Sequence, residues 1–190
     1  MATQERVYTA NDVWQLEQQP LNPTEKYYLI DGELMIKMAP TELHGDVSVR
    51  LSSYLFLFVD EHNLGRVTGE VGFHPPGDRG TALLPDVAFT SKARTAQPAR
   101  SSYVPYMPDL AVEIISPSQT LAQVRRKAEV YLRHGAAVVW LLDPLAKTAE
   151  VWRRGTDDAP VVERIAGDGD LTGGDILPGF RLPLARIFSN

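Results

Sequence analysis

Two apolar segments of this chain each carry a carboxylate inside a run that is typical of a buried β-strand. The segment PDLAVEIISPS, residues 108–118, holds Glu113 between a valine and an isoleucine, and LLPDVAF, residues 83–89, holds Asp86 after a proline. Aliphatic runs next to proline predict central strands. A lone ionised carboxylate is strongly unfavourable in such a strand unless it is paired, protonated or bound to a metal. Any fold of this chain must therefore provide partners for Asp86 and Glu113.

Two explanations account for this pattern. An Asp and a Glu at neighbouring strand ends supply the hard oxygen ligands that suit Mg²⁺ or Mn²⁺, with water and phosphate completing the coordination. Such an ion could activate water and neutralise charge on a phosphodiester. The alternative is structural, with a strand-end Asp and a salt-bridged Glu at the edge of the sheet, because ion pairs are common in folded proteins. The pattern alone leaves both explanations open.

The remaining sequence predicts an α/β fold, an α+β mixed sheet flanked by helices. Thr9 and Asp12 stand at capping-box spacing, and Asp31-Gly32 is a strong hairpin signal between two strand-like runs. The predicted helices lie within 9–19, 42–63 and 120–134, and the predicted strands within 26–40, 66–73, 83–91, 108–118, 138–144, 148–154 and 160–166. The last residues, 182–188, predict a short helical turn, and the polar, proline-bearing residues 91–108 predict a surface loop.

Composition and charge exclude several classes of protein. A chain of 190 residues is expected to form a single domain, residues 1–190. It has no cysteine, which excludes disulfides, thiolate zinc sites and a cysteine nucleophile. No apolar run reaches the roughly 18–20 residues of a membrane span, and the N-terminus lacks the pattern of a signal peptide, so we expect a cytoplasmic protein that does not enter a membrane. The formal net charge of −5 argues against a general nucleic-acid coat but leaves room for a local basic cleft.

The order of the motifs resembles a known family. The PD pair at 85–86 and VEI at 112–114 resemble the PD-(D/E)XK nuclease superfamily, whose core is an αβββαβ unit, and the whole chain resembles its Uma-two family of restriction-type endonucleases. The matching segments are YYLIDGEL at 27–34, a proline at 40 with HG at 44–45, LPDVAF at 84–89, PDLAVEIISPS at 108–118, RRKAEVYLRHGAAVVWLLDP at 125–144 and GGDILPGF at 173–180. This resemblance implies a restriction-endonuclease-like core with additional antiparallel strands.

The resemblance also implies a metal site. Carried over by position, Asp86 and Glu113 are the metal ligands, with the backbone carbonyl of Ile114 as a third, and Mg²⁺ or Mn²⁺ is the cofactor. One departure concerns the segment YYLIDGE, in which family members commonly carry Glu at the second position. This chain has Tyr28 there. If that Glu assists metal binding in the family, this chain has lost a ligand.

The lysine of the superfamily motif is also displaced. It normally stands two residues after the Glu, where this chain has Ile115. The resemblance offers Lys127 as the replacement, and helical periodicity puts Lys127 at the border of the apolar stripe of its helix, from which it could turn toward the carboxylates. The alternative is a surface lysine that snorkels. The other lysines considered lie outside the motif segments, namely Lys37, Lys92 and Lys147.

His44 is the remaining candidate catalytic residue. Its helical angle matches that of Leu51 and Leu55, so it is expected to face the sheet from the first turn of its helix. A histidine in such a position is commonly a core residue that makes one hydrogen bond. The family motif, HG after a proline, favours a role in lining the site, through substrate phosphate or a metal-bound water. Tyr131 either orients Lys127 from i+4 or packs.

These observations together predict a metal-dependent endonuclease that hydrolyses DNA phosphodiester bonds, with DNA as the partner and a homodimer as the family-level expectation. The second hypothesis is a catalytically silent member of the family that acts as a nucleic-acid-binding or protein-interaction module, favoured by Tyr28, Ile115 and the acidic net charge. The sequence does not define a cleavage site, a preference for DNA over RNA, or a biological role.

Overall fold

The structure is a computed structural model, and it describes residues 7–19, 26–94, 102–157 and 159–188. Its α-helices are α1 (Ala10–Glu17), α2 (Glu42–Glu61), α3 (Leu121–Arg133) and α4 (Leu184–Ile187), and Gly174–Ile176 form a 3₁₀ turn. Its strands are β1 (Lys26–Ile30), β2 (Glu33–Lys37), β3 (Gly65–Gly69), β4 (Val87–Ser91), β5 (Leu110–Ile114), β6 (Val138–Asp143), β7 (Thr148–Arg154), β8 (Pro160–Ala166), β9 (Asp170–Thr172) and β10 (Arg181–Pro183).

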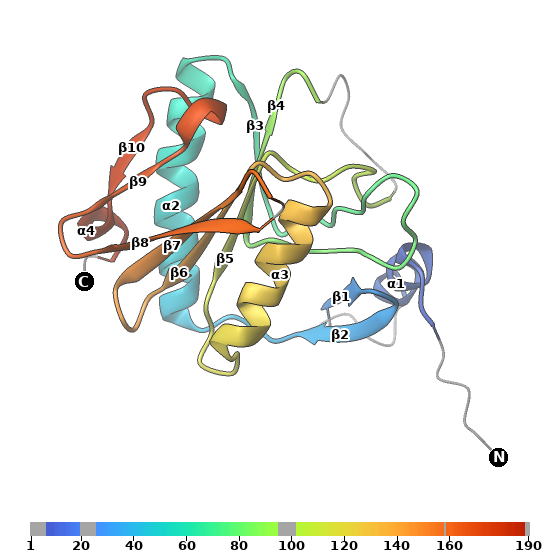
Figure 1. Ribbon diagram of the computed structural model, residues 1–190. Helices are drawn as coiled ribbons and strands as arrows, with labels where there is room; N and C mark the ends of the chain where they lie inside the picture. The colour runs from blue at the N-terminus through green and yellow to red at the C-terminus, as the bar shows by residue number, and fades with distance from the viewer. Residues whose placement is uncertain (1–6, 20–25, 95–101, 158, 189–190) are drawn as a thin grey trace.

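A six-stranded mixed sheet forms the centre of the molecule, in the order β3-β4-β5-β6-β7-β8. Only the β5–β6 pair of this sheet is parallel, and α3 provides the crossover that a parallel connection needs. Helix α2 covers one face of the sheet and α3 covers the other (Figure 1). The predicted hairpin is present but lies outside this sheet, because β1 and β2 form a two-stranded sheet of their own.

The alternation of side chains along β4 and β5 separates the two faces. Val87 and Val112 pair across the strands and pack in the cluster on the α2 side, whereas Ala88 and Ala111 pair and pack on the α3 side. Successive side chains of a strand point to opposite faces. The next pair along the same register is Asp86 with Glu113, so both carboxylates belong to the α3 face.

Helix ends follow local sequence signals. Thr9 and Asp12 form the predicted capping box of α1, and Thr120 caps α3 together with Gln123. Helix α2 ends at Glu61, and Gly65 opens β3, where a Cβ atom would lie 2.1 Å from the Thr90 carbonyl oxygen. No helix in the described part of the chain is long and apolar enough to cross a membrane.

The predicted surface loop at 91–108 is partly wrong. Residues 95–101 lie outside the described residues, but Tyr103 is 4% exposed and Met107 is 1% exposed. Tyr103 stacks edge-on against Trp14 of α1, with ring centroids 5.4 Å apart, and its hydroxyl donates to Glu17. The second half of this segment therefore fills the core between α1 and the sheet.

Candidate active site

Asp86 and Glu113 lie side by side at the end of β4 and β5. Both are buried, each at 3% exposure, and the backbone N–H of Ile114 donates to Asp86 Oδ2 over 2.7 Å. Both line one small cavity, here called the carboxylate cavity, whose lining includes Lys37, His44, Asp86, Glu113, Ile114 and Lys127. Its volume is about 20 Å³. Since about 10–15 Å³ is enough for one water molecule, the cavity has room for one water-sized species.

The Asp86 carboxylate is surrounded by donors. Its Oδ2 atom lies 3.1 Å from His44 Nε2 and also accepts the Ile114 N–H. Its Oδ1 atom makes no hydrogen bond within the described residues but lies 2.9 Å from Lys37 Nζ, an ion pair without hydrogen-bond angles. Burial by itself raises the pKa of Asp86, but the His44 hydrogen bond and the Lys37 charge outweigh it and hold the pKa well below its usual range. Asp86 is therefore ionised at neutral pH.

The Glu113 carboxylate has one partner for each oxygen. Lys127 Nζ donates to Oε2 over 2.8 Å, and the Tyr131 hydroxyl donates to Oε1 over 2.9 Å. Lys127 is itself 3% exposed, so its ammonium points inward and does not snorkel to the surface. Burial, and then the charge of Glu113, raises the pKa of Tyr131, which stays a neutral donor. Glu113 is thus tolerated in its strand because an ammonium and a hydroxyl replace the hydrogen bonds that water would make to an exposed carboxylate.

Tyr28 also lies at this site, next to Lys127. The Lys127 ammonium stands 4.3 Å from the centre of the Tyr28 ring, at cation–π distance. Burial also raises the pKa of the Tyr28 phenol, so it offers no anionic oxygen at neutral pH. The position at which family members commonly carry Glu is therefore beside the proposed cavity, and here it presents an aromatic face to the lysine.

His44 lies where its helical angle predicts. It occupies the first turn of α2, which Thr41 caps, and it is 7% exposed. Its Nε2 atom contacts Asp86, and Nδ1 has no hydrogen-bond partner among the described residues. The imidazole therefore makes the single contact expected of a core histidine, to the Asp86 carboxylate, and it also lines the carboxylate cavity; contact with a phosphate or a metal-bound water stays a prediction.

Lys37 is the site residue that sequence reasoning missed. Its position outside the motif segments argues against a place in the site, but the structure puts Lys37 in the lining of the carboxylate cavity. Lys37 ends β2, its side chain is 11% exposed, and its ammonium lies beside Asp86. The available signal was its place in the short stretch between the predicted hairpin and the His44 helix, a stretch that joins two motif segments.

The residues of the carboxylate cavity fit a small, hard divalent cation. Within the described residues no group of three or more Asp, Glu or His side chains converges on one point. Mg²⁺, however, is commonly bound by one or two carboxylates, with water filling the other positions. Two adjacent carboxylates, an Asp86 oxygen without a hydrogen bond and room for one small species satisfy that requirement. Ile114, the predicted third ligand, also lines the cavity.

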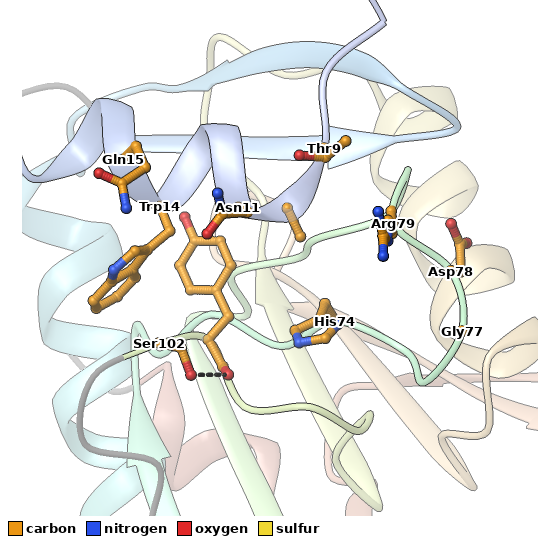
Figure 2. A pocket seen from close by; sticks show the side chains of 11 residues that line it. Thr9, Asn11, Trp14, Gln15, His74, Gly77, Asp78, Arg79 and Ser102 are labelled. Carbon is orange, nitrogen blue, oxygen red and sulfur yellow. Dashed lines mark hydrogen bonds between the residues drawn. The ribbon is translucent and has the colours of Figure 1, made fainter.

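A larger cavity, of about 750 Å³, lies between α1 and residues 74–79 and is shown in Figure 2. Trp14, Tyr103, His74 and Arg79 line it, and none of the predicted site residues is among the described residues around it. Its carboxylate, Asp78, accepts from the Gly80 N–H and the Thr81 hydroxyl and so stabilises a turn. The smaller cavity is the better candidate because it contains the paired carboxylates.

Comparison with known proteins identifies the family. A family model, Uma2, matches residues 13–185 and carries the description "Putative restriction endonuclease". The chain belongs to the Uma2 family. A crystal structure described as "a putative nuclease belonging to DUF820 from Anabaena variabilis" superposes with a TM-score of 0.78 at 21% identity, over 95% of this chain and 97% of that one. No curated protein matches the chain significantly.

Membership of the Uma2 family confirms the resemblance, and the likeness to the Anabaena protein confirms the mixed α+β, nuclease-like fold. The family match covers every residue of the carboxylate cavity named above. A nuclease role acting on nucleic acid is therefore supported at the level of the family.

Proposed function

We propose that this Uma2 protein is a Mg²⁺- or Mn²⁺-dependent endonuclease that hydrolyses phosphodiester bonds in DNA, with residues 1–190 acting as one domain in the cytoplasm. The observation that carries the proposal is the buried pair Asp86 and Glu113, which share one cavity with the Lys127 ammonium. The family description, a restriction endonuclease, favours DNA as the substrate.

Each residue of the cavity has a role in this chemistry. Asp86 and Glu113 would hold the cation together with the carbonyl of Ile114, and the cation supplies an activated water and neutralises phosphate charge. His44 and the Ile114 N–H keep Asp86 oriented, and Tyr131 does the same for Glu113. The Lys127 ammonium stabilises the negative charge that develops on the phosphate in the transition state.

The proposal is tested by cleavage of supercoiled plasmid with purified protein in Mn²⁺ and in Mg²⁺. The matched variant is the double substitution Asp86→Asn with Glu113→Gln, which keeps the size of both side chains. Nicking by the wild-type protein that chelation and the double substitution both abolish supports the proposal. Equal nicking by wild type and variant would mean that the activity comes from a contaminant or from another site.

A silent binding module remains the second candidate. The structure favours it in one respect, because both carboxylates already pair with an ammonium, through Lys37 and Lys127. A protein of this kind would shift DNA in a gel in the presence of Ca²⁺ and leave it uncut in Mg²⁺ and Mn²⁺. The plasmid assay therefore separates the two functions directly.

A homodimer is part of the same proposal. Strand β8 ends the six-stranded sheet, and among the described residues no strand pairs with its outer edge. Val161 is 57% exposed and Val162 is 38% exposed, on opposite faces of this strand. An edge strand with exposed apolar residues is a template for pairing with another chain, and a second copy would cover it.

A further inference from the structure

Lys37 has no part in the chemistry proposed above, yet it contacts the only Asp86 oxygen that lacks a hydrogen bond among the described residues. A carboxylate oxygen has two lone pairs in its plane. Oδ2 already accepts from the Ile114 N–H and contacts His44 Nε2, so it has no lone pair left. A cation that binds Asp86 must therefore use Oδ1, the atom beside Lys37.

The position of Lys37 comes from a part of the fold separate from the carboxylate strands. Lys37 ends β2 of the hairpin sheet, and its ammonium also lies 3.3 Å from the Leu84 carbonyl oxygen and 3.7 Å from Glu70. Two carboxylates face the Lys37 ammonium, Asp86 at 2.9 Å and Glu70 at 3.7 Å, and both favour its charged form. Lys37 therefore carries a full positive charge at neutral pH.

The charges of the cavity balance when no divalent ion is bound. Asp86 and Glu113 contribute two negative charges, and Lys37 and Lys127 contribute two positive charges. Two carboxylates with Lys127 alone would leave one net negative charge. Lys37 removes that excess and so weakens the attraction for a divalent cation.

We propose that Lys37 is a resident counter-ion of Asp86, which stabilises the metal-free protein and competes with the divalent cation for Oδ1. This inference rests on the proposed metal site. Lys37 acts as a positioning residue, because it affects the reaction through Asp86. Cation binding then requires Lys37 to leave Oδ1, and Glu70, 3.7 Å from the ammonium, is the acceptor to which it turns.

A purely structural role for Lys37 makes the opposite prediction for metal affinity. If Lys37 only anchors the hairpin to Leu84, then its removal loosens the cavity and weakens both stability and metal binding. If it competes with the metal, its removal lowers stability but strengthens metal binding. The two roles therefore predict opposite changes in metal affinity when Lys37 is removed.

The experiment uses Lys37→Met, which keeps the aliphatic stem and removes the charge. The matched control is Lys26→Met, because Lys26 pairs with Lys37 across the hairpin and also contacts Glu70 but does not line the carboxylate cavity. Lys37→Arg, which keeps the charge, separates the loss of charge from the change in side-chain shape. The measurements are the Mn²⁺ dissociation constant by calorimetry without DNA, and the melting temperature in chelator and in excess Mn²⁺.

We expect Lys37→Met to bind Mn²⁺ at least about tenfold more tightly than wild type, because one unit of nearby positive charge is removed. Its melting temperature should fall in chelator and rise more than that of wild type when Mn²⁺ is added. Lys26→Met and Lys37→Arg should bind Mn²⁺ within about threefold of wild type, because neither removes charge from the cavity.

Equal or weaker Mn²⁺ binding by Lys37→Met than by wild type overturns the inference, whatever the plasmid assay shows. Tighter binding by Lys37→Met supports it, even if wild type binds too weakly to measure or fails to cut DNA. If Lys37→Met binds Mn²⁺ more tightly but the wild type does not cut DNA, the nuclease proposal fails while the counter-ion role stands. Absence of Mn²⁺ binding in every variant overturns both the inference and the metal site.

Discussion

At the scale of single residues, the chain tolerates the buried carboxylates of Asp86 and Glu113 because each is compensated by a cation. Breaking a buried ion pair is costly, since the remaining charge has neither water nor partner. The Glu113–Lys127 pair is the clearest case, with both side chains almost fully buried and 2.8 Å between Nζ and Oε2. The same residues therefore support both stability and the proposed chemistry.

Lys127→Ala is expected to lower the free energy of unfolding at pH 7 by about 3–5 kcal/mol. It should also slow plasmid cleavage by at least about 100-fold, because a donor to the transition state is lost. Urea titration and the nicking assay measure the two effects. Lys127→Arg should restore stability more than rate, since a planar guanidinium keeps the charge but not the compact shape of the ammonium.

The control for Lys127 is Arg126→Ala in the same helix. Arg126 is exposed and pairs with Glu33 at the hairpin, away from the carboxylate cavity. This variant also removes one positive charge from α3, and it should change stability by at most about 1 kcal/mol. Wild-type cleavage by Lys127→Ala would contradict the transferred-lysine assignment.

At the scale of elements, α3 forms one wall of the carboxylate cavity. Side-chain contacts hold it to the sheet at Glu113 of β5 and at Glu150 of β7. Its buried face contributes Lys127 and Tyr131 to the site. Its Arg125 side chain binds Glu150 of β7, which also accepts from the Trp152 indole and pairs with Arg164 of β8. Glu150 thus connects a helix and two strands through one carboxylate.

Glu150→Gln should lower the free energy of unfolding by about 1 kcal/mol at pH 7 and by progressively less as the pH falls below the unfolded pKa of about 4.3. Burial raises the pKa of Glu150, but hydrogen bonds from Arg125 and Trp152 outweigh it, so the folded pKa lies below the usual value. The stability that the Glu150 carboxylate contributes is therefore present above its unfolded-state pKa of about 4.3. It is lost as the pH falls through the pKa of Glu150 in the folded protein.

Thermal unfolding of wild type and Glu150→Gln across pH 3–7 tests this, with Glu129→Gln on the exposed side of α3 as the control. A difference between wild type and Glu150→Gln that stays constant with pH would mean that packing, and not charge, accounts for the effect.

At the scale of the whole molecule, the two ends of the six-stranded sheet differ. Strand β3 lies against α2, whereas β8 has exposed side chains on both faces and only Ile165 buried. The carboxylate cavity lies at β4 and β5, toward the covered end. Association of two copies through β8 would therefore leave both cavities open to substrate.

Val161→Glu is expected to convert a dimer into a monomer, because it places a charge on the apolar edge of β8. Sedimentation at a protein concentration of about 10 μM measures the change, well above the dissociation constants of stable homodimers. The control is Val49→Glu, at a similarly exposed valine on the outer side of α2. A monomeric wild type, or a dimer that Val161→Glu leaves intact, would contradict the role of β8.

Patterns that depend on neighbouring residues could be predicted from the sequence alone. Capping by Thr9 and the inward-facing position of His44 follow from local backbone geometry, whereas Lys127, predicted at the border of its helix's apolar stripe, is 3% exposed. The family resemblance adds the order of the motifs and with it the fold, and the residues that it singles out line one cavity, while their roles stay predictions.

Tertiary structure alone decided the contacts between segments that are distant in sequence. Lys37 reaches Asp86 from a separate sheet, the Tyr131 hydroxyl donates to Glu113, and Tyr103 and Met107 enter the core from a segment that looks polar. The physical reason is that local periodicity sets which face a side chain points to, but not what packs there. That choice depends on how the hairpin, α1 and α3 dock against the sheet, which local periodicity does not specify.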